Sequence, residues 1–383
     1  MPIGYLVTTV LMATSVVSSF SRLRPRRSSP FRLRSVFGFL LNWPFIAVGL
    51  LVASTGLAIA EGDLGPVFWI GLGLATVAAA GLVVLGRRAQ GTVPAVGRAL
   101  DEGLGAGWRE NVDAELADRL RRRPSLAGTM FAPISSGRRR VERIANIRYG
   151  PAGRGNLLDL YRDRSGRTGR PTLIYLHPGA FRLGSKRLGA RHLILRLASH
   201  GWVCGSANYR LGPSAKFPDP LIDVKRVIDW VREHGGEYGA DPTAVFLVGS
   251  SAGGHLASMA ALTPNDPRFQ PGFETADTSV AGAICLYGYY GSVDSGEQAS
   301  SPLANVSLDA PPCFVVHGDS DTLVLVEDAR RFVDQLRVKS LNPVVYAELP
   351  GTQHGFDLFR SRRFETVVDG IEAFAAWTSA RNG

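Results

Sequence analysis

Cysteine is scarce in this sequence: its 383 residues include three, Cys204, Cys285 and Cys313. The count is odd and no spacing suits a zinc site, so neither a disulfide framework nor a zinc-binding module is expected. Each cysteine lies in a strongly apolar, strand-like run, which predicts three buried small hydrophobic side chains. Free thiols also agree with a reducing compartment.

Lysine is absent from the first 140 residues, which contain 17 arginines and 8 acidic residues. The remaining residues are nearly balanced, so the formal net charge of +10 belongs to the N-terminal part. A basic segment can bind nucleic acid, but no nucleic-acid-binding motif accompanies these arginines. They flank uncharged apolar runs instead, which favours a membrane and argues against nucleic acid as a partner.

Charge is missing altogether from three apolar runs, Pro2–Phe20, Val36–Ala60 and Pro66–Gly86. The second and third are long enough to cross a hydrocarbon core of about 30 Å, and the short link between them predicts a helical hairpin. The first is rich in Thr and Ser and is a candidate third span. It makes a poor signal peptide because no basic residue precedes it. Buried helices of a large soluble domain are the alternative. We expect residues 1–90 to form a membrane anchor of two or three transmembrane helices.

The arginines predict the orientation of that anchor. Six of them lie between residues 22 and 34, and Arg87 and Arg88 follow the third run. The link at 61–65 carries Glu61 and Asp63 and no basic residue. Basic flanks tend to stay in the cytoplasm, so with three spans everything after Arg88 is expected on the cytoplasmic side of a multi-pass membrane protein.

Two further segments follow the anchor. Residues 91–140 mix charged and apolar residues at roughly helical spacing, which predicts one or two amphipathic helices. They are interpreted as a linker, a membrane-surface element or a lid. In residues 141–383 a leading hairpin is followed by strands that alternate with helices, which predicts an α/β fold: a mostly parallel sheet with helices on both faces.

The stretch "VGSSAGGH", residues 248–255, joins a predicted buried strand to a predicted helix. In that context Gly249, Ser251 and Gly253 fit the G-x-S-x-G pattern of a nucleophile on a strained turn, the nucleophile elbow. Glycines on either side avoid clashes with the neighbouring strand and helix. Ser251 is therefore the candidate nucleophile, at the N-terminal end of a helix whose amides and dipole favour negative charge. Ser250 occupies a variable position and is expected to pack or to form hydrogen bonds.

A serine needs a positioned base to act as a nucleophile. Among the seven histidines, His354 lies in the glycine-flanked loop "LPGTQHGF", after a strand-like run and before the last helix. His192, His200 and His234 are expected to be solvated at helix surfaces or ends. His255, one turn into the helix after Ser251, is expected to pack or cap, and His317 at a strand end is expected to brace a turn.

An acid is expected before the histidine in chain order. The segment "HGDSD" offers Asp319 and Asp321, of which Asp319 beside a glycine is also a natural turn residue. In "LHPGAF" the amides of Gly179 and Ala180, with that of Ala252 after the nucleophile, are placed to donate to a developing oxyanion. Pro178 has no amide hydrogen and cannot donate.

Taken together, these motifs resemble the α/β-hydrolase fold, close to the hormone-sensitive-lipase-like and related carboxylesterases, over residues 141–380. "HPGAF" resembles their H-G-G-G oxyanion motif, with Gly179 and Ala180 at the donor positions. "NYRLGP" and "GSSAGGHLA" resemble two further family segments. "HGDSD" resembles the H-G-x-x-D pattern and selects Asp321, and "GTQHGF" selects His354. The membrane-spanning start resembles that of some actinobacterial lipase/esterase-like proteins.

The resemblance implies a membrane-anchored serine carboxylic ester hydrolase that needs no metal or organic cofactor. Its triad would be Ser251, His354 and Asp321, and its substrate a small-molecule or lipid ester. An acyltransferase or an arylformamidase-like amide hydrolase on the same triad is one alternative. A non-catalytic membrane scaffold that retains the fold is another.

Overall fold

The computed structural model describes residues 2–18, 20, 44–62, 64–112, 114–119, 140–293 and 298–382. The chain divides into two compact units. One contains Met1–Thr92 with the loop segments Gly318–Leu325 and Leu349–Phe356. The other contains Val93–His317, Val326–Glu348 and Asp357–Gly383.

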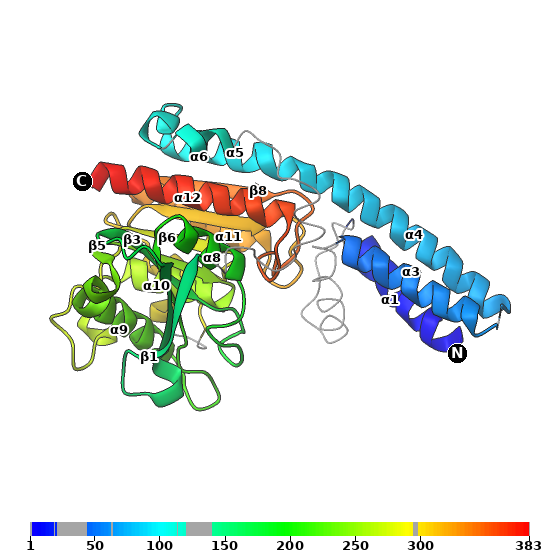
Figure 1. Cartoon of the computed structure of the whole chain (residues 1–383), viewed down its shortest axis with the longest axis horizontal. Coiled ribbons are helices and arrows are strands. Elements are labelled where there is room, and N and C mark those ends of the chain that lie inside the picture. The colour runs from blue at the N-terminus through cyan, green and yellow to red at the C-terminus, as the bar shows by residue number, and fades with distance from the viewer. Residues whose placement is uncertain are drawn as a thin grey trace. The chain divides into compact units, whose positions relative to one another are not determined.

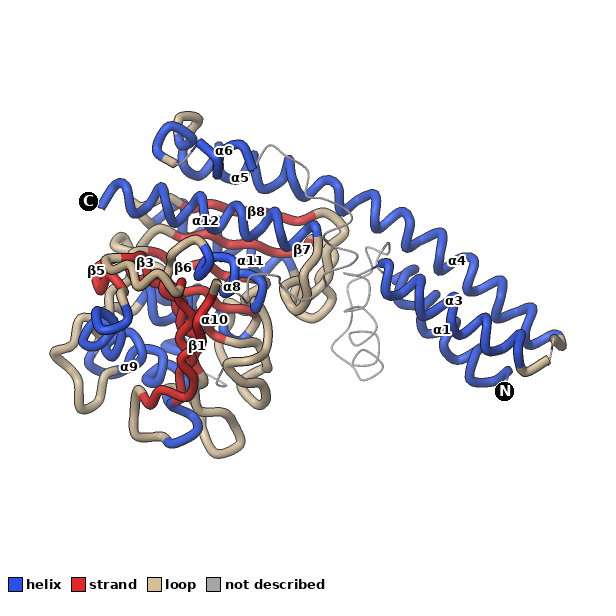
Figure 2. The backbone as a smooth tube through the Cα atoms, in the orientation of Figure 1, coloured by secondary structure: helices blue, strands red, loops and turns tan. Residues whose placement is uncertain are grey.

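The second unit is built on an eight-stranded sheet of order β1-β2-β4-β3-β5-β6-β7-β8, drawn in red in Figure 2. The strands are β1 Val141–Arg148, β2 Leu157–Asp163, β3 Arg170–Leu176, β4 Val203–Ala207, β5 Ala240–Ser250, β6 Gly282–Leu286, β7 Cys313–Gly318 and β8 Val344–Leu349. The pairs β1–β2 and β2–β4 are antiparallel, whereas β4, β3, β5, β6 and β7 pair in parallel. The predicted leading hairpin and mostly parallel sheet are therefore confirmed.

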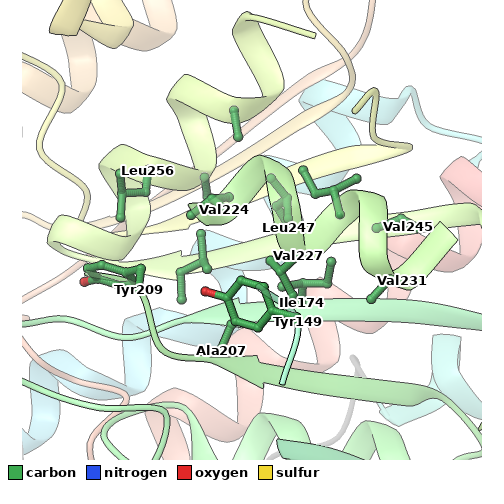
Figure 3. Packing of buried hydrophobic residues seen from close by; sticks show 14 of the residues in the cluster. Tyr149, Ile174, Ala207, Tyr209, Val224, Val227, Val231, Val245, Leu247 and Leu256 are labelled. Carbon is green, nitrogen blue, oxygen red and sulfur yellow. The ribbon is translucent and has the colours of Figure 1, made fainter. Parts of the chain in front are cut away.

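Helices cover both faces of this sheet: α8 Arg191–Ser199, α9 Asp219–His234, α10 Ala252–Leu262, α11 Val326–Lys339 and α12 Arg362–Asn382. On one face α9 and α10 pack against alternate residues of the central strands, so that Val224, Val227 and Leu256 meet Ile174 and Leu247 (Figure 3). Parallel strands buried on both faces read as continuous apolar runs, as β3 and β5 do. This core fixes the strand ends from which the candidate site residues emerge.

Residues 92–119 contain α5 Thr92–Leu104 and α6 Ala114–Arg119, and α5 packs against β8 and α12 (Figure 1). A Cβ atom on Gly103 would lie 2.7 Å from Cγ2 of Val345, and one on Gly370 would lie 2.7 Å from Cγ1 of Val96. Such spacing leaves room for glycine alone. The first part of the predicted linker or lid is thus packed against β8 and α12, and residues 120–139 lie outside the described part.

Three apolar helices make up most of the first unit: α1 Pro2–Ser18, α3 Pro44–Ala60 and α4 Pro66–Arg88. Among the described residues, the continuous helix Pro66–Leu104, which includes α4, is long and apolar enough to cross a membrane. The apolar parts of α1 and α3, Ile3–Val17 and Ala47–Ala60, are shorter than a full span. The start of the second predicted run and the arginine-rich link at 22–34 lie outside the described residues.

Candidate active site

Ser251 forms the turn between β5 and α10 and has φ 55° and ψ −115°. A positive φ is costly for a residue with a Cβ atom and is typical of functional turns. The turn is fixed because the Ser251 amide donates to the Leu286 carbonyl at 2.9 Å and the Ser251 carbonyl accepts from the His255 amide at 3.0 Å. Ser251 as a whole residue is 9% exposed. The residue that follows, Ala252, is the first of α10.

The glycines around this turn are required by close backbone contacts. A Cβ atom on Gly249 would lie 1.9 Å from the Gly253 carbonyl oxygen, and one on Gly253 would lie 2.1 Å from the Leu176 carbonyl oxygen. No side chain fits at such distances. The steric reason expected from the G-x-S-x-G pattern therefore applies to this turn.

The loop after β3 carries the predicted oxyanion donors in a tight left-handed turn. Gly179, Ala180 and Phe181 have φ values of 144°, 51° and 60°. The Gly179 carbonyl accepts from the amides of Arg182 and Leu183 at 3.0 and 3.1 Å. A Cβ atom on Gly179 would lie 1.7 Å from the Leu183 carbonyl oxygen, so a side chain at this position would change the loop.

The "NYRLGP" segment holds this loop, a role that its sequence alone did not reveal. The Tyr209 hydroxyl donates to the His177 carbonyl at 2.7 Å, and the Gly212 amide donates to the Phe181 carbonyl at 2.8 Å. The rings of His177 and Tyr209 stack with centroids 4.3 Å apart. Burial lowers the pKa of His177 to about 4, so this imidazole is neutral at physiological pH.

Asp321 and His354 are brought together, each in a loop that follows a strand. Nδ1 of His354 lies 2.7 Å from Oδ2 of Asp321, and both side chains are buried. The other oxygen of Asp321 accepts from the amides of Leu323 and Val324 at 2.8 and 2.9 Å. The carboxylate is thus fixed on one side by its own loop and faces the imidazole with the other.

Asp319, the alternative acid, has a different role. Its Oδ1 accepts from the Gly351 amide at 2.7 Å and from the Ser320 hydroxyl at 2.8 Å. These contacts make Asp319 a turn residue. It connects the acid loop, Gly318–Leu325, to the histidine loop, Leu349–Phe356. The Asp321–His354 pair lies in the first compact unit, and Ser251, Gly179, Ala180 and Ala252 lie in the second.

Ser250 forms hydrogen bonds, in keeping with its expected role. Its hydroxyl donates to Oδ2 of Asp357 at 2.6 Å and lies 3.1 Å from the Tyr175 hydroxyl. Sequence reasoning did not single out Asp357. The available signal was an acidic residue in an otherwise apolar stretch, "HGFDLF", three residues after His354.

His192 corrects one expectation, because it is buried rather than solvated. Its Nε2 lies 3.0 Å from Oε2 of Glu365 on α12, an inter-helix pair that helical periodicity cannot reveal. His200 lies 2.7 Å from Glu372 through Nδ1 and is partly exposed. His234 is partly exposed at the end of α9, as expected for a helix end.

His255 packs inside α10 as expected. Its Nε2 lies 2.9 Å from the Ser300 carbonyl oxygen. Burial lowers its pKa to about 4. His317 is buried in β7, directly before the acid loop.

Within the part of the chain that the structure describes, no group of three or more His, Cys, Asp or Glu side chains is arranged to hold a metal ion. The cysteines Cys204, Cys285 and Cys313 are free and buried, as predicted.

A mostly parallel sheet between helix layers, with a serine on a left-handed strand-to-helix turn, defines an α/β-hydrolase. The family model BD-FAE matches residues 158–294. The probable carboxylic ester hydrolase LipM of Mycobacterium tuberculosis is 38% identical, over 98% of this chain and 93% of the relative. Esterase LipQ of the same organism is 37% identical, over 72% of each chain.

The chain belongs to the carboxylesterase family of α/β-hydrolases and is an enzyme of the carboxylesterase/lipase type. A solved structure supports the fold alone: the butyrate-bound esterase 2 of Thermogutta terrifontis is 24% identical, with a TM-score of 0.52. The aligned part covers 59% of this chain and 90% of the Thermogutta chain.

Proposed function

We propose that the protein is a membrane-anchored carboxylic ester hydrolase that acts through a triad of Ser251, His354 and Asp321. The observation that carries this proposal is the buried 2.7 Å contact between His354 and Asp321, in a chain whose elbow presents Ser251 at a φ of 55°. The carboxylate orients the imidazole and stabilises its cation, which is what a serine nucleophile requires from its base.

Sheet topology supports the same grouping. Strands β5, β6 and β7 run parallel, so their carboxyl ends lie at one edge of the sheet. Ser251 directly follows β5, and Asp321 follows β7 by three residues. In open α/β sheets ligands bind outside the carboxyl ends of the strands.

The proposed reaction is acyl transfer in two steps. The Ser251 hydroxyl attacks the ester carbonyl while His354 takes its proton, and the amides of Gly179, Ala180 and Ala252 stabilise the tetrahedral oxyanion. His354 then gives that proton to the leaving alcohol. Water, activated by the same imidazole, attacks the acyl-enzyme, which releases the acid and restores the serine.

The packing of the first unit supports membrane anchoring. Its interior holds polar groups: Thr9 is fully buried and the Tyr5 hydroxyl lies 3.1 Å from Oγ1 of Thr55. Its helices pack closely through glycine, since a Cβ atom on Gly81 would lie 2.1 Å from Cγ1 of Val16. Large apolar side chains face outward on all three helices, among them Ile3, Val7, Leu50, Leu57, Trp69 and Ile70. Small residues between helices and apolar residues outside are typical of membrane bundles.

The proposed topology is multi-pass, with the catalytic domain, residues 141–383, on the cytoplasmic side. Arg87 and Arg88 at the end of α4 support it, since basic residues at a span's end favour the cytoplasm. An anchor of this kind favours ester substrates that partition into lipid, because it holds the enzyme where they accumulate.

Labelling with a fluorophosphonate probe, followed by assays on p-nitrophenyl esters of increasing acyl length, tests the activity. We expect covalent labelling at Ser251 and release of p-nitrophenol. A protein that is folded but neither labelled nor active would be a scaffold and would contradict the proposal. Acyl transfer to an added alcohol or amine in preference to water would identify an acyltransferase instead.

A further inference from the structure

Asp357 is a buried carboxylate that the proposed triad does not use. It is 1% exposed and accepts hydrogen bonds from groups on several elements. The Ser250 hydroxyl donates to Oδ2 at 2.6 Å, the Tyr175 hydroxyl lies 3.2 Å from the same oxygen, and the Ala190 amide donates to it at 3.1 Å. The Tyr287 hydroxyl donates to Oδ1.

The direction of these hydrogen bonds is set by the protonation of the tyrosines. Burial raises the pKa of both the Tyr175 and the Tyr287 hydroxyl well above the usual value, so both remain protonated and donate. A carboxylate is the side chain that accepts from several donors at once and returns none. An amide of the same size would offer a single acceptor oxygen and point an N–H₂ group at hydroxyl and amide donors.

The donors come from places that matter for the reaction. Tyr175 lies on β3, Ser250 ends β5, and Tyr287 follows β6; these three strands are neighbours in the sheet. Ser250 directly precedes Ser251, and Ala190 directly precedes α8. Asp357 itself follows His354 by three residues.

The loop that carries Gly179 and Ala180, here called the oxyanion loop, also contacts this cluster. A Cβ atom on Gly189 would lie 2.2 Å from the Tyr175 hydroxyl oxygen and 3.2 Å from both Oδ2 of Asp357 and Cδ of Pro178. Gly189 has a φ of 81°, and its lack of a side chain lets the loop that carries Gly179 close against the carboxylate. The Asp357 carboxylate therefore contacts the residue before Ser251 and lies beside the oxyanion loop.

We propose that Asp357 is a positioning residue of this hydrolase: its carboxylate fixes the turn that carries Ser251 and the loop that carries Gly179, so that the nucleophile and the proposed oxyanion donors are held in place. The inference rests on the proposed function, since it assigns Asp357 to the reaction of that triad. It predicts that loss of the carboxylate slows the chemical step more than it weakens substrate binding, because the partners of Asp357 hold reacting groups.

The test compares Asp357→Asn with a matched variant away from the site, Thr278→Val. Thr278 is fully buried and its hydroxyl donates to Gln270 at 2.7 Å, so its loss also removes buried hydrogen bonds. Both variants should lower the melting temperature. At a temperature where both are folded by circular dichroism, Asp357→Asn should lower kcat on the order of 10-fold to 100-fold, with KM nearly unchanged. Its rate of inactivation by a fluorophosphonate should fall in parallel, whereas Thr278→Val should keep both rates.

An Asp357→Asn protein that is folded and keeps the wild-type kcat and inactivation rate would overturn the inference. If that variant does not fold, Tyr287→Phe decides, because it removes one donor and keeps the ring. A lowered kcat in Tyr287→Phe supports the positioning role, and an unchanged kcat overturns it. A wild-type protein that the fluorophosphonate fails to label would overturn the proposed function itself, and the inference with it.

Discussion

Ser250 and Ser251 are adjacent, but their hydroxyls serve different purposes. Ser250 is the last residue of β5 and donates to Asp357 at 2.6 Å. Ser251 has the left-handed backbone of the turn and precedes α10. We therefore expect Ser251→Ala to lower kcat/KM for a short ester on the order of 10⁴-fold or more. Ser250→Ala should cost far less, at most on the order of 10-fold, because the nucleophile stays in place although the turn loses its hydrogen bond to Asp357. Similar large losses from both substitutions would contradict the assignment.

The two acids after β7 give a second prediction at this scale. Asp321→Asn should lower kcat on the order of 10⁴-fold, because asparagine favours the wrong imidazole tautomer and cannot stabilise the cation. Asp319→Asn should cost far less, since its contacts are with Gly351 and Ser320 rather than with His354. Steady-state kinetics on folded proteins of both kinds checks this, and a more damaging Asp319→Asn would show that the acid was misassigned.

Individual residues also show what sequence can and cannot predict. The elbow was predictable because Gly249, Ser251 and Gly253 are close in the chain and their constraint is local. Asp357 was not, because Tyr175, Ser250 and Tyr287 meet it only after β3, β5 and β6 have become neighbours. The contrast between Asp319 and Asp321 needed a family pattern, since both lie next to the same strand end.

Helices α8 and α12 are joined by a buried ionic cluster. Arg196 of α8 lies 2.9 Å from Glu365 and contacts Asp369 and, at 3.8 Å, Glu372 of α12. His192 also lies 3.0 Å from Glu365. Each helix shows an amphipathic pattern on its own, but which charges pair depends on how the helices pack, so His192 was expected on the solvated face.

The same cluster predicts a pH-dependent contribution to stability. Burial by itself raises the pKa of Glu365, but the hydrogen bonds and charges of His192 and Arg360 outweigh it and lower that pKa from 4.5 to about 2. A carboxyl with a lowered folded-state pKa stabilises the fold above its ordinary pKa and loses that contribution as the pH falls toward the folded value.

Glu365→Gln should therefore lower the free energy of unfolding by about 2 kcal/mol at neutral pH. The difference from wild type should shrink between about pH 4.5 and pH 2, since the wild-type carboxyl becomes protonated there. Urea unfolding at several pH values measures this, with the exposed Glu237→Gln as a control that should change little. A pH-independent difference would contradict the ionic explanation.

For the whole molecule, the position of the proposed catalytic residues along the sequence predicts the effect of removing the anchor. Every proposed catalytic residue lies beyond residue 176, and α5, which packs on β8 and α12, begins at Thr92. Deletion of residues 1–90 should give a soluble enzyme that hydrolyses short esters at a rate similar to that of the full chain. Hydrolysis of long-chain esters in vesicles should fall more. Equal losses on both substrates would mean that the deleted helices support the site itself.

Topology is the second prediction at this scale. Alkaline phosphatase, which is active outside the cytoplasm, should be inactive when fused after Gly383, and green fluorescent protein at the same position should fluoresce. A fusion after Gly62, in the link between α3 and α4, should give the reverse pattern. An active phosphatase after Gly383 would reverse the orientation and would mean that α1 does not span, or that α3 and α4 do not form a hairpin.

The burial of the three cysteines has a practical consequence for such measurements. A thiol reacts with a maleimide as its thiolate, which is the nucleophile. Burial raises the pKa of the Cys285 thiol to about 12 and raises the pKa values of Cys204 and Cys313 as well. The folded wild-type protein should thus react very little with a maleimide. A single cysteine can then be introduced at an exposed position, by Leu64→Cys in the link or by Val338→Cys on α11. Any labelling of such a variant would come from the introduced cysteine. A maleimide that does not cross membranes should label Leu64→Cys in intact cells. In lysed cells it should label both variants. The wild-type protein serves as the unlabelled control when the two sides of the bilayer are mapped in this way.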